Sequence, residues 1–372
     1  MTRQTRIVRG AFAALLAGAT AAAAAAQADE VADFYKGNTI SVIISTGVGG
    51  SNNVNARLLM EHMVRHIPGK PDYVAKNMPG GGHVRATNYL YNVAPQDGTY
   101  IGAVVRFFVL HQALGGTGVR YDARKFNYLG ATGSSNVVGQ AWKTSGVTSI
   151  RQVMERELIV GGTGVGSGTV MFPSMLNALA GTRFKIVSGY KSGHEIDLAM
   201  ERGEVGGRLG NTFESLRAIN PAWLTKDGPV SILVQIGLEK EPGFPDIPLA
   251  LDLVRTGQDR KVMALFSGIV SVGSPIFTNQ GVPRARAEAL RKAFAATMKD
   301  PAYLAATKKA RFDIQPKSAA KLHRIVTDIL DAPPEVIARA KAALGRKGLV
   351  DCKTFTKAQY CRSGKRGKKK KS

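Results

Sequence analysis

From residue 39 onward, short apolar runs alternate with amphipathic segments. Residues 39–45 read TISVIIS, a β-branched run typical of a buried strand, and an amphipathic helix follows up to residue 67. A strand, a helix and another strand come next, at residues 73–76, 83–91 and 99–105. This alternation predicts a mostly parallel sheet covered by helices.

The same alternation begins again in the middle of the chain. Strands are expected at residues 158–160, 184–188 and 230–236, with helices at 171–180 and 195–202. The last third is helical in pattern, over residues 284–299, 301–310, 318–331 and 334–344. Two similar βα systems predict two α/β lobes in one chain.

The N-terminus has the layout of a secretory signal peptide. Arginines at positions 3, 6 and 9 precede the small, apolar run 11–26, and Ala26-Gln27-Ala28 fits a cleavage site. A membrane anchor is the alternative, but the run is short and rich in alanine, which inserts weakly. We therefore expect residues 1–28 to be removed and the mature protein to be exported.

The chain is strongly basic, with a net charge of +24, and residues 362–372 hold cations without acids. Such a charge favours anionic partners, but it does not choose between a carboxylate, a phosphate, DNA and a lipid headgroup. Cys352 and Cys361 are the two cysteines. Export to an oxidising compartment favours a disulfide between them. Two free thiols are the alternative, and metal binding is less favoured because no histidine lies nearby.

Three glycine-rich loops each follow a predicted strand and precede a predicted helix, at residues 47–53, 77–83 and 161–169. In an open α/β sheet such loops lie at the carboxyl ends of the strands, where ligands bind. Glycine allows close approach, and the free N–H groups of a helix start attract anions. One such loop could be only a tight turn; three together predict an anion site built from main-chain donors.

Nucleotide and catalytic signatures are missing. The first loop lacks the third glycine of the dinucleotide fingerprint, Asn77 stands where an acidic residue should bind ribose, and no Walker lysine follows any loop. No Gly-x-Ser-x-Gly elbow occurs, and Met63 stands where a metalloprotease with His62 and His66 would need glutamate. The sequence therefore predicts neither an enzyme nor a bound cofactor or metal.

Cations follow several of the predicted strands. Arg106, Lys191 and Arg208 stand at or near strand ends, where a cation can pair with a carboxylate. Taken singly, each is more often a surface cation than a ligand-binding residue. We include all three among the candidate ligand-binding residues.

An ordered set of motifs resembles the Bug-type (TctC-like) solute receptors of tripartite tricarboxylate transporters. The resemblance covers residues 34–344. The motifs are GVGGSNNVNAR at 47–57, NMPGGG at 77–82, DGT at 97–99, TGVGSGT at 163–169, GYKSG at 189–193, ERGEV at 201–205 and PDIP at 245–248.

The resemblance implies a periplasmic-binding-protein type II-like fold. Two α/β lobes are joined by two crossovers, and the ligand cleft lies between them. Lobe 1 should contain residues 29–130 and 263–345, and lobe 2 residues 131–262. Residues 346–372 should form a basic C-terminal tail that carries the cysteine pair.

By match to the family's motifs, the first two glycine loops should clamp the ligand, and the third should face them from the second lobe. The implied residues are Gly49, Gly50, Ser51, Asn53, Gly80 and Gly81 in lobe 1, and Thr163, Gly166, Ser167 and Thr169 in lobe 2. The family usually has aspartate at the Asn53 position, often proline at Val48, and an acid at Gly206. These departures predict a more positive cleft, so the ligand cannot be copied from relatives.

The sequence thus predicts a monomeric, periplasmic solute-binding protein that closes like a Venus flytrap on a small carboxylate. Its partners would be the large and small membrane subunits of a tripartite tricarboxylate transporter, and not nucleic acid. A ligand-sensing receptor module for a membrane partner is an open alternative. A basic nucleic-acid-binding protein is a weaker one, because the signal peptide argues against it.

Overall fold

The computed structural model of the chain describes residues 29–133, 135–241, 243–312, 314–345, 349–352 and 354–355. The predicted signal peptide, Cys361 and the basic C-terminal residues lie outside the described residues. The expected disulfide therefore stays a prediction, although Cys352 itself is fully buried.

The strands form two six-stranded sheets. The first sheet has the order β11-β4-β10-β3-β1-β2, and the second has the order β12-β7-β6-β8-β5-β9. The first comprises β1 (Thr39–Ile44), β2 (Asp72–Asn77), β3 (Tyr100–Ala103), β4 (Asn127–Ala131), β10 (Pro275–Thr278) and β11 (Lys317–Ser318). The second comprises β5 (Val137–Trp142), β6 (Leu158–Gly162), β7 (Phe184–Ser188), β8 (Gly207–Thr212), β9 (Val230–Ile236) and β12 (Leu349–Asp351).

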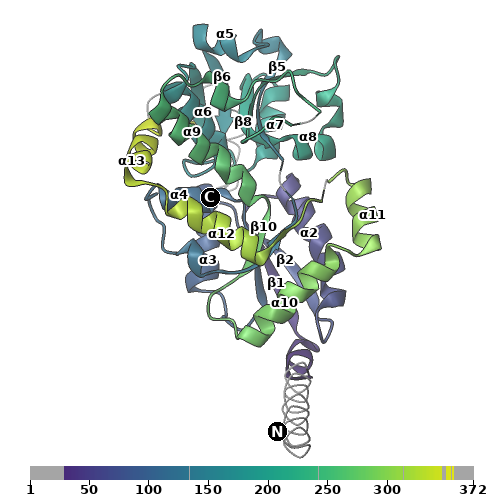
Figure 1. The fold of residues 1–372 in the computed structure, drawn as a ribbon. Coiled ribbons are helices and arrows are strands. Elements are labelled where there is room, and N and C mark those ends of the chain that lie inside the picture. Colours follow the sequence, from purple (N-terminus) through teal and green to yellow (C-terminus); the bar gives the residue numbers. More distant parts are fainter. Residues whose placement is uncertain are drawn as a thin grey trace, which may run out of the picture.

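Helices cover both sheets, and Figure 1 shows two lobes stacked one above the other. The α-helices are α2 (Ser51–Met63), α3 (Val84–Asn92), α4 (Phe107–Ala113), α5 (Ile150–Glu155), α6 (Gly168–Leu179), α7 (Gly193–Glu201), α8 (Phe213–Ile219), α9 (Gly257–Gly268), α10 (Arg284–Thr297), α11 (Pro301–Lys309), α12 (Ala319–Leu330) and α13 (Pro334–Ala343). The 3-10 helices are η1 (Val64–His66), η2 (Gly81–His83), η3 (Ala123–Lys125), η4 (Lys143–Ser145), η5 (Pro221–Leu224), η6 (Ala250–Leu253) and η7 (Ile269–Val272). The predicted fold class, two α/β lobes, is confirmed.

The first strands of each alternation pair in parallel as expected, but each sheet is mixed because it also contains antiparallel pairs. β1 pairs in parallel with β2 and β3, and β6 pairs in parallel with β7 and β8. However, β10 runs antiparallel to both β3 and β4, and β5 runs antiparallel to both β8 and β9. The chain passes from one sheet to the other before β5, before β10 and before β12. β5 and β10 enter antiparallel to their neighbours, whereas β12 enters parallel to β7.

The C-terminal segment returns to the second lobe. α13 packs against α6 and α9, and β12 then adds an edge strand parallel to β7. The backbone N–H of Cys352 donates to the carbonyl of Ser188 over 2.8 Å. The sequence analysis did not foresee this strand, because its three residues carry no periodicity of their own. The lobe boundaries that we expected stay predictions.

Candidate functional site

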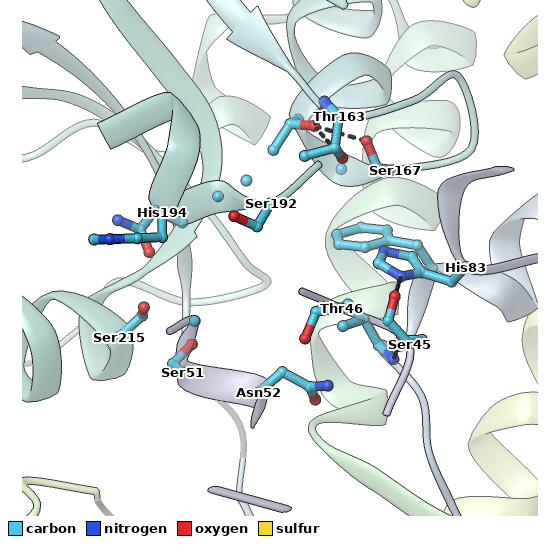
Figure 2. A pocket seen from close by; sticks show the side chains of 18 of the residues that line it. Ser45, Thr46, Ser51, Asn52, His83, Thr163, Ser167, Ser192, His194 and Ser215 are labelled. Atoms are coloured by element: carbon cyan, nitrogen blue, oxygen red, sulfur yellow. Dashed lines mark hydrogen bonds between the residues drawn. The ribbon is translucent and has the colours of Figure 1, made fainter. Parts of the chain in front are cut away.

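A cavity of about 360 Å³ lies between the two sheets, at the carboxyl ends of their strands. All three glycine-rich loops reach it: the loops after β1, β2 and β6. The loops after β7 and β8 complete its wall from the second lobe. Figure 2 shows these segments converging, with Ser51 and Asn52 on one side and Thr163 and Ser167 on another.

Three helices of nine or more residues begin at the cavity wall. α2 starts at Ser51, α6 at Gly168 and α7 at Gly193, all of which line the cavity. The first turns of α2 and α6 contain no acidic residue. Their main-chain N–H groups and positive dipole ends are therefore not offset by a local carboxylate, and they favour an anion in the cavity.

Hydroxyl groups supply much of the polar wall. The Thr169 Oγ1 lies 3.1 Å from the Thr163 Oγ1 and 2.7 Å from the Ser167 Oγ, and it accepts a hydrogen bond from the Thr163 N–H. This network, drawn in Figure 2, fixes the orientation of the third glycine loop. The other lining hydroxyls belong to Ser45, Thr46, Ser51, Tyr190, Ser192, Thr212, Ser215 and Ser274. Because a hydroxyl both donates and accepts, this wall suits a polar ligand.

Arg106 is the cation that the structure leaves least satisfied. It caps α4, is 6% exposed and lines the cavity. Its Nη1 donates to the Gly273 carbonyl over 3.5 Å, and its Nε has no hydrogen-bond partner among the described residues. Burial lowers the pKa of Arg106 to about 10, while the Glu214 carboxylate acts in the opposite direction. Arg106 therefore stays charged at neutral pH and retains donor capacity for an anion.

Arg208 is already paired. Its Nη1 donates to the Asp197 Oδ1 over 2.6 Å and to the Gly193 carbonyl over 2.8 Å. Both side chains of this ion pair are more than nine-tenths buried. Burial raises the pKa of Asp197, and Arg208 opposes that shift. Arg208 thus holds the start of α7 against β8, and Lys191 lies exposed at the same wall.

The cavity wall carries acids as well as cations. Asp197 and Glu214 both line it, and neither was singled out from the sequence. Burial lowers the pKa of His83 to about 4, so that this ring is neutral at pH 7; its Nδ1 lies 3.3 Å from the Ser45 carbonyl oxygen. The two acids partly offset Arg106, Lys191 and Arg208.

The two lobes touch on both sides of the cavity. A Cβ built on Gly82 would lie 2.5 Å from the Gly166 Cα, which leaves no room for a side chain. On the other side, a Cβ built on Gly47 would lie 3.4 Å from the Ser192 Cβ, and one on Gly49 would lie 3.4 Å from the His194 ring. The two lobes are therefore in contact on both sides of the cavity in this structure.

The structure brings all but two of the predicted ligand-binding residues to the cavity wall. Those that line it are Gly49, Gly50, Ser51, Gly80, Gly81, Arg106, Thr163, Ser167, Thr169, Lys191 and Arg208. Asn53 does not: its Oδ1 accepts hydrogen bonds from Arg57 and Asn77. Gly166 does not either, because it packs against Gly82 and the His111 ring at the contact between the lobes. The ligand-binding role of all these residues stays a prediction.

Other lining residues were missed. Thr46 directly precedes the first glycine loop and Asn52 stands inside it, whereas Thr212 ends β8 and Glu214 and Ser215 follow that strand. The residues at the end of β8 were missed because β8 itself was not predicted from the sequence. A prediction of that strand would have drawn attention to the polar side chains at its end. Phe107 and Phe312 also line the cavity, and no local signal marks them as such.

Among the described residues, no group of three or more histidines, cysteines or acids is placed to hold a metal ion. None of their helices is long and apolar enough to cross a membrane. His66 contacts the Asp300 carboxylate, with its Nε2 2.6 Å from the Oδ2.

No known sequence family and no curated protein matches the chain. Solved structures do match it. The periplasmic binding protein BugD superposes with a TM-score of 0.64 and 17% identity, covering 83% of this chain and 98% of its own. The chain has the fold of the Bug-type periplasmic binding proteins. This confirms, at the level of the fold, the resemblance seen in the sequence motifs.

Two further structures with this periplasmic binding fold carry ligands. MatC from Rhodopseudomonas palustris, with bound malate, has a TM-score of 0.63 and 18% identity, covering 83% of this chain and 99% of its own. Another R. palustris protein, with adipate, has a TM-score of 0.63 and 16% identity, and the superposition covers 82% of this chain and 97% of that protein. At this identity the similarity establishes the fold alone.

Proposed function

We propose that this chain is an extracytoplasmic solute-binding protein that closes on a small carboxylate and delivers it to a tripartite tricarboxylate-type membrane transporter. One observation carries the proposal. A closed cavity between two lobes is lined by three helix N-termini and by a buried arginine whose donors are only partly used. Its volume of about 360 Å³ suits a small organic ligand.

The carboxylate would be bound mainly by main-chain donors. The N–H groups at the starts of α2 and α6 face the cavity from opposite lobes, so a bound anion would hold both lobes together. Arg106 would add a charge-assisted hydrogen bond inside a desolvated site. The polar groups of the ligand would then form hydrogen bonds with the hydroxyls of the third glycine loop, which belong to Thr163, Ser167 and Thr169.

Binding fits this site better than catalysis does. His83, the buried histidine of the wall, contacts a main-chain carbonyl and not a nucleophile. The serine and threonine hydroxyls of the third loop bond to one another, without a general base in their network. The malate and adipate of the two solved neighbours support a carboxylate as the ligand. The predicted signal peptide and the neighbours' periplasmic class support a place in the periplasm.

Isothermal titration of the chain from residue 29 tests the proposal. The panel contains mono-, di- and tricarboxylates of increasing length, aromatic acids, inorganic phosphate, a nucleotide and duplex DNA. We expect at least one carboxylate to bind with a dissociation constant on the order of micromolar, equivalent to about −8 kcal/mol. Binding of DNA or nucleotide without any acid would overturn it. Delivery is tested by growth on the identified acid after deletion of the gene for this chain.

A further inference from the structure

A second hollow lies on the outside of the molecule, where the two lobes meet. This groove, of about 760 Å³, has one wall from α8 and η5 of the second lobe and the other from α11 of the first. In Figure 1, α11 lies beside α2, below α8. The groove therefore has both of its walls only while the lobes are closed.

The floor of the groove is apolar. Leu224 and Phe244 line it from the second lobe, and Leu304 and Ile314 from the first. Phe244 is held in place by stacking on Phe213, with ring centroids 4.2 Å apart. Leu304 is 40% exposed, one of the few large apolar side chains that the described surface presents to solvent. A concave apolar floor of this kind favours a partner side chain that can enter it.

The rim of the groove is basic. Arg217, Lys308 and Arg311 line it, and none of its described lining residues is acidic. Arg217 is paired with Glu241, its Nη2 lying 2.6 Å from the Oε1. Lys308 and Arg311 are exposed and form no ion pair with any described residue. Lys308 lies in the last turn of α11, where a positive charge stabilises the helix dipole. Arg311 lies beyond the end of α11, so the dipole does not account for its charge.

One side chain connects the groove to the cavity. Phe312 lines both the ligand cavity and the groove. Phe312 is 5% exposed, so it forms a shared wall between the two spaces. The shape of the groove thus depends on the state of the cleft through its two walls and through Phe312.

We propose that this groove docks an acidic segment of a partner protein that carries apolar anchor side chains, and that docking requires the closed cleft. The basic rim favours an acidic partner because opposite charges attract. The concave floor can accommodate protruding side chains, which a flat membrane surface lacks, and so favours a protein segment. The proposal does not depend on which solute the cavity binds. A carboxylate titration and a docking assay can therefore fail independently.

Fluorescence anisotropy tests the chemistry of the groove. The probe is a labelled synthetic peptide of about 15 residues with leucines at helical spacing and glutamates between them, long enough to form a helix on binding. The comparison peptide replaces every glutamate with lysine. We expect the acidic peptide to bind, the basic peptide not to bind, and Lys308→Glu with Arg311→Glu to weaken binding by about tenfold or more. Leu304→Ser should weaken it also.

The matched control is Arg284→Glu with Lys292→Glu. These two exposed cations of α10 lie away from the groove and make the same change in net charge. The acidic peptide should bind this control like the unmodified protein. Equal weakening in both pairs would show a nonspecific charge effect and overturn the site. The proposal would also be overturned if the acidic peptide did not bind. Vesicles of phosphatidylglycerol test a membrane as the alternative occupant: if the groove variant lost vesicle binding and the control variant kept it, the groove would bind a membrane and not a protein segment.

A disulfide between the lobes tests the dependence on closure. Gly47→Cys with Ser192→Cys places two thiols where the Cβ atoms would be 3.4 Å apart, close to the separation in a disulfide, about 3.5–4.5 Å. Oxidation should hold the cleft closed, and reduction should release it in the same protein. We expect the oxidised form to bind the acidic peptide several-fold more tightly than the reduced form. Equal binding by the two forms would refute the dependence on closure.

Discussion

At the scale of single residues, the site depends on which buried charges are already paired. Arg208 and Asp197 satisfy each other, whereas Arg106 makes one long hydrogen bond to a carbonyl. Burying a charge is costly unless it is paired and hydrogen-bonded, so a ligand carboxylate would relieve Arg106 more than Arg208. The two arginines should therefore respond differently to the same substitution.

Replacing Arg106 with methionine should weaken carboxylate binding by about tenfold or more, because it removes a charge-assisted hydrogen bond worth roughly 1.5–3 kcal/mol. Arg208→Met should mainly lower the free energy of unfolding, by about 3 kcal/mol, because it leaves Asp197 buried without its partner. Isothermal titration and urea unfolding of both variants separate the two roles. Equal loss of affinity in both variants, with unchanged stability, would contradict this assignment.

The side chain of Asn53 should not affect the ligand directly. Its Oδ1 accepts from the Arg57 Nε over 3.2 Å and from the Asn77 Nδ2 over 2.9 Å, and it does not line the cavity. An aspartate would keep both acceptor contacts, so Asn53→Asp should leave the affinity for mono- and dicarboxylates within a few-fold. A selective loss of dicarboxylate affinity would return Asn53 to the binding site.

Acidification should destabilise the fold through His83. Burial lowers the pKa of this ring from 6.5 to about 4. Below pH 6.5 the unfolded chain takes up a proton that the folded protein does not accept until about pH 4, so stability falls with pH across that window. Burial lowers the pKa of His111 too, which adds to the same trend. His83→Asn should reduce the loss of melting temperature between pH 7 and 5, whereas His323→Asn, at an exposed position, serves as the control.

At the scale of elements, β12 forms one edge of the sheet in the second lobe. β12 pairs with β7, whose end leads into the cavity loop that contains Lys191. Cys352 and Tyr190 belong to the same buried apolar cluster. Residues 349–352, the part of the C-terminal segment that forms and ends β12, therefore support a wall of the cavity without lining it.

Truncation after Leu344 should lower the free energy of unfolding by about 2 kcal/mol or more, because it removes a buried side chain and an edge strand. Urea unfolding measures this change. Truncation after Phe355, which keeps β12, is the matched control and should preserve most of the stability. Unchanged stability after the longer deletion would show that β12 contributes little to the lobe. On this basis the affinity should fall also, since the Lys191 loop loses its support.

At the scale of the whole molecule, closure brings main-chain atoms of the two lobes into contact. Gly82 has φ +61, in the left-handed region that favours glycine, and its missing side chain leaves room for Gly166 of the other lobe. No side chain at either position would allow this approach. The shape of the cleft thus depends on two glycines that lie far apart in the sequence.

Gly82→Asn should hold the lobes apart. Asparagine tolerates left-handed backbone better than other side chains do, so the change acts mainly by steric contact with Gly166. Small-angle scattering should show a larger radius of gyration, and titration should show weaker ligand binding. Gly203→Asn is the control, because its φ is also positive and nothing lies within 4 Å of its Cβ position. A radius of gyration equal to that of the control would contradict this account of closure.

The sequence by itself determined the elements with strong local signals. Strand β7 and strand β9 begin and end where the apolar runs predicted, and α10 to α13 follow the expected helical segments. It also placed the glycine loops at the cavity, because turn chemistry and strand order along the chain are local properties. It failed for short elements such as β10 and β12, whose four and three residues become strands only by pairing with distant partners.

Tertiary structure alone decided which charges meet. Asp197 and Glu214 join the cavity, Asn53 turns away from it, and Gly82 meets Gly166, in each case through contacts between segments far apart in the chain. The two acids therefore offset part of the positive charge of Arg106, Lys191 and Arg208. The groove between α8 and α11 likewise takes one wall from each lobe. Local periodicity predicts the secondary structure of each segment. The direction of a side chain and the residues that it contacts depend instead on the packing of the two lobes.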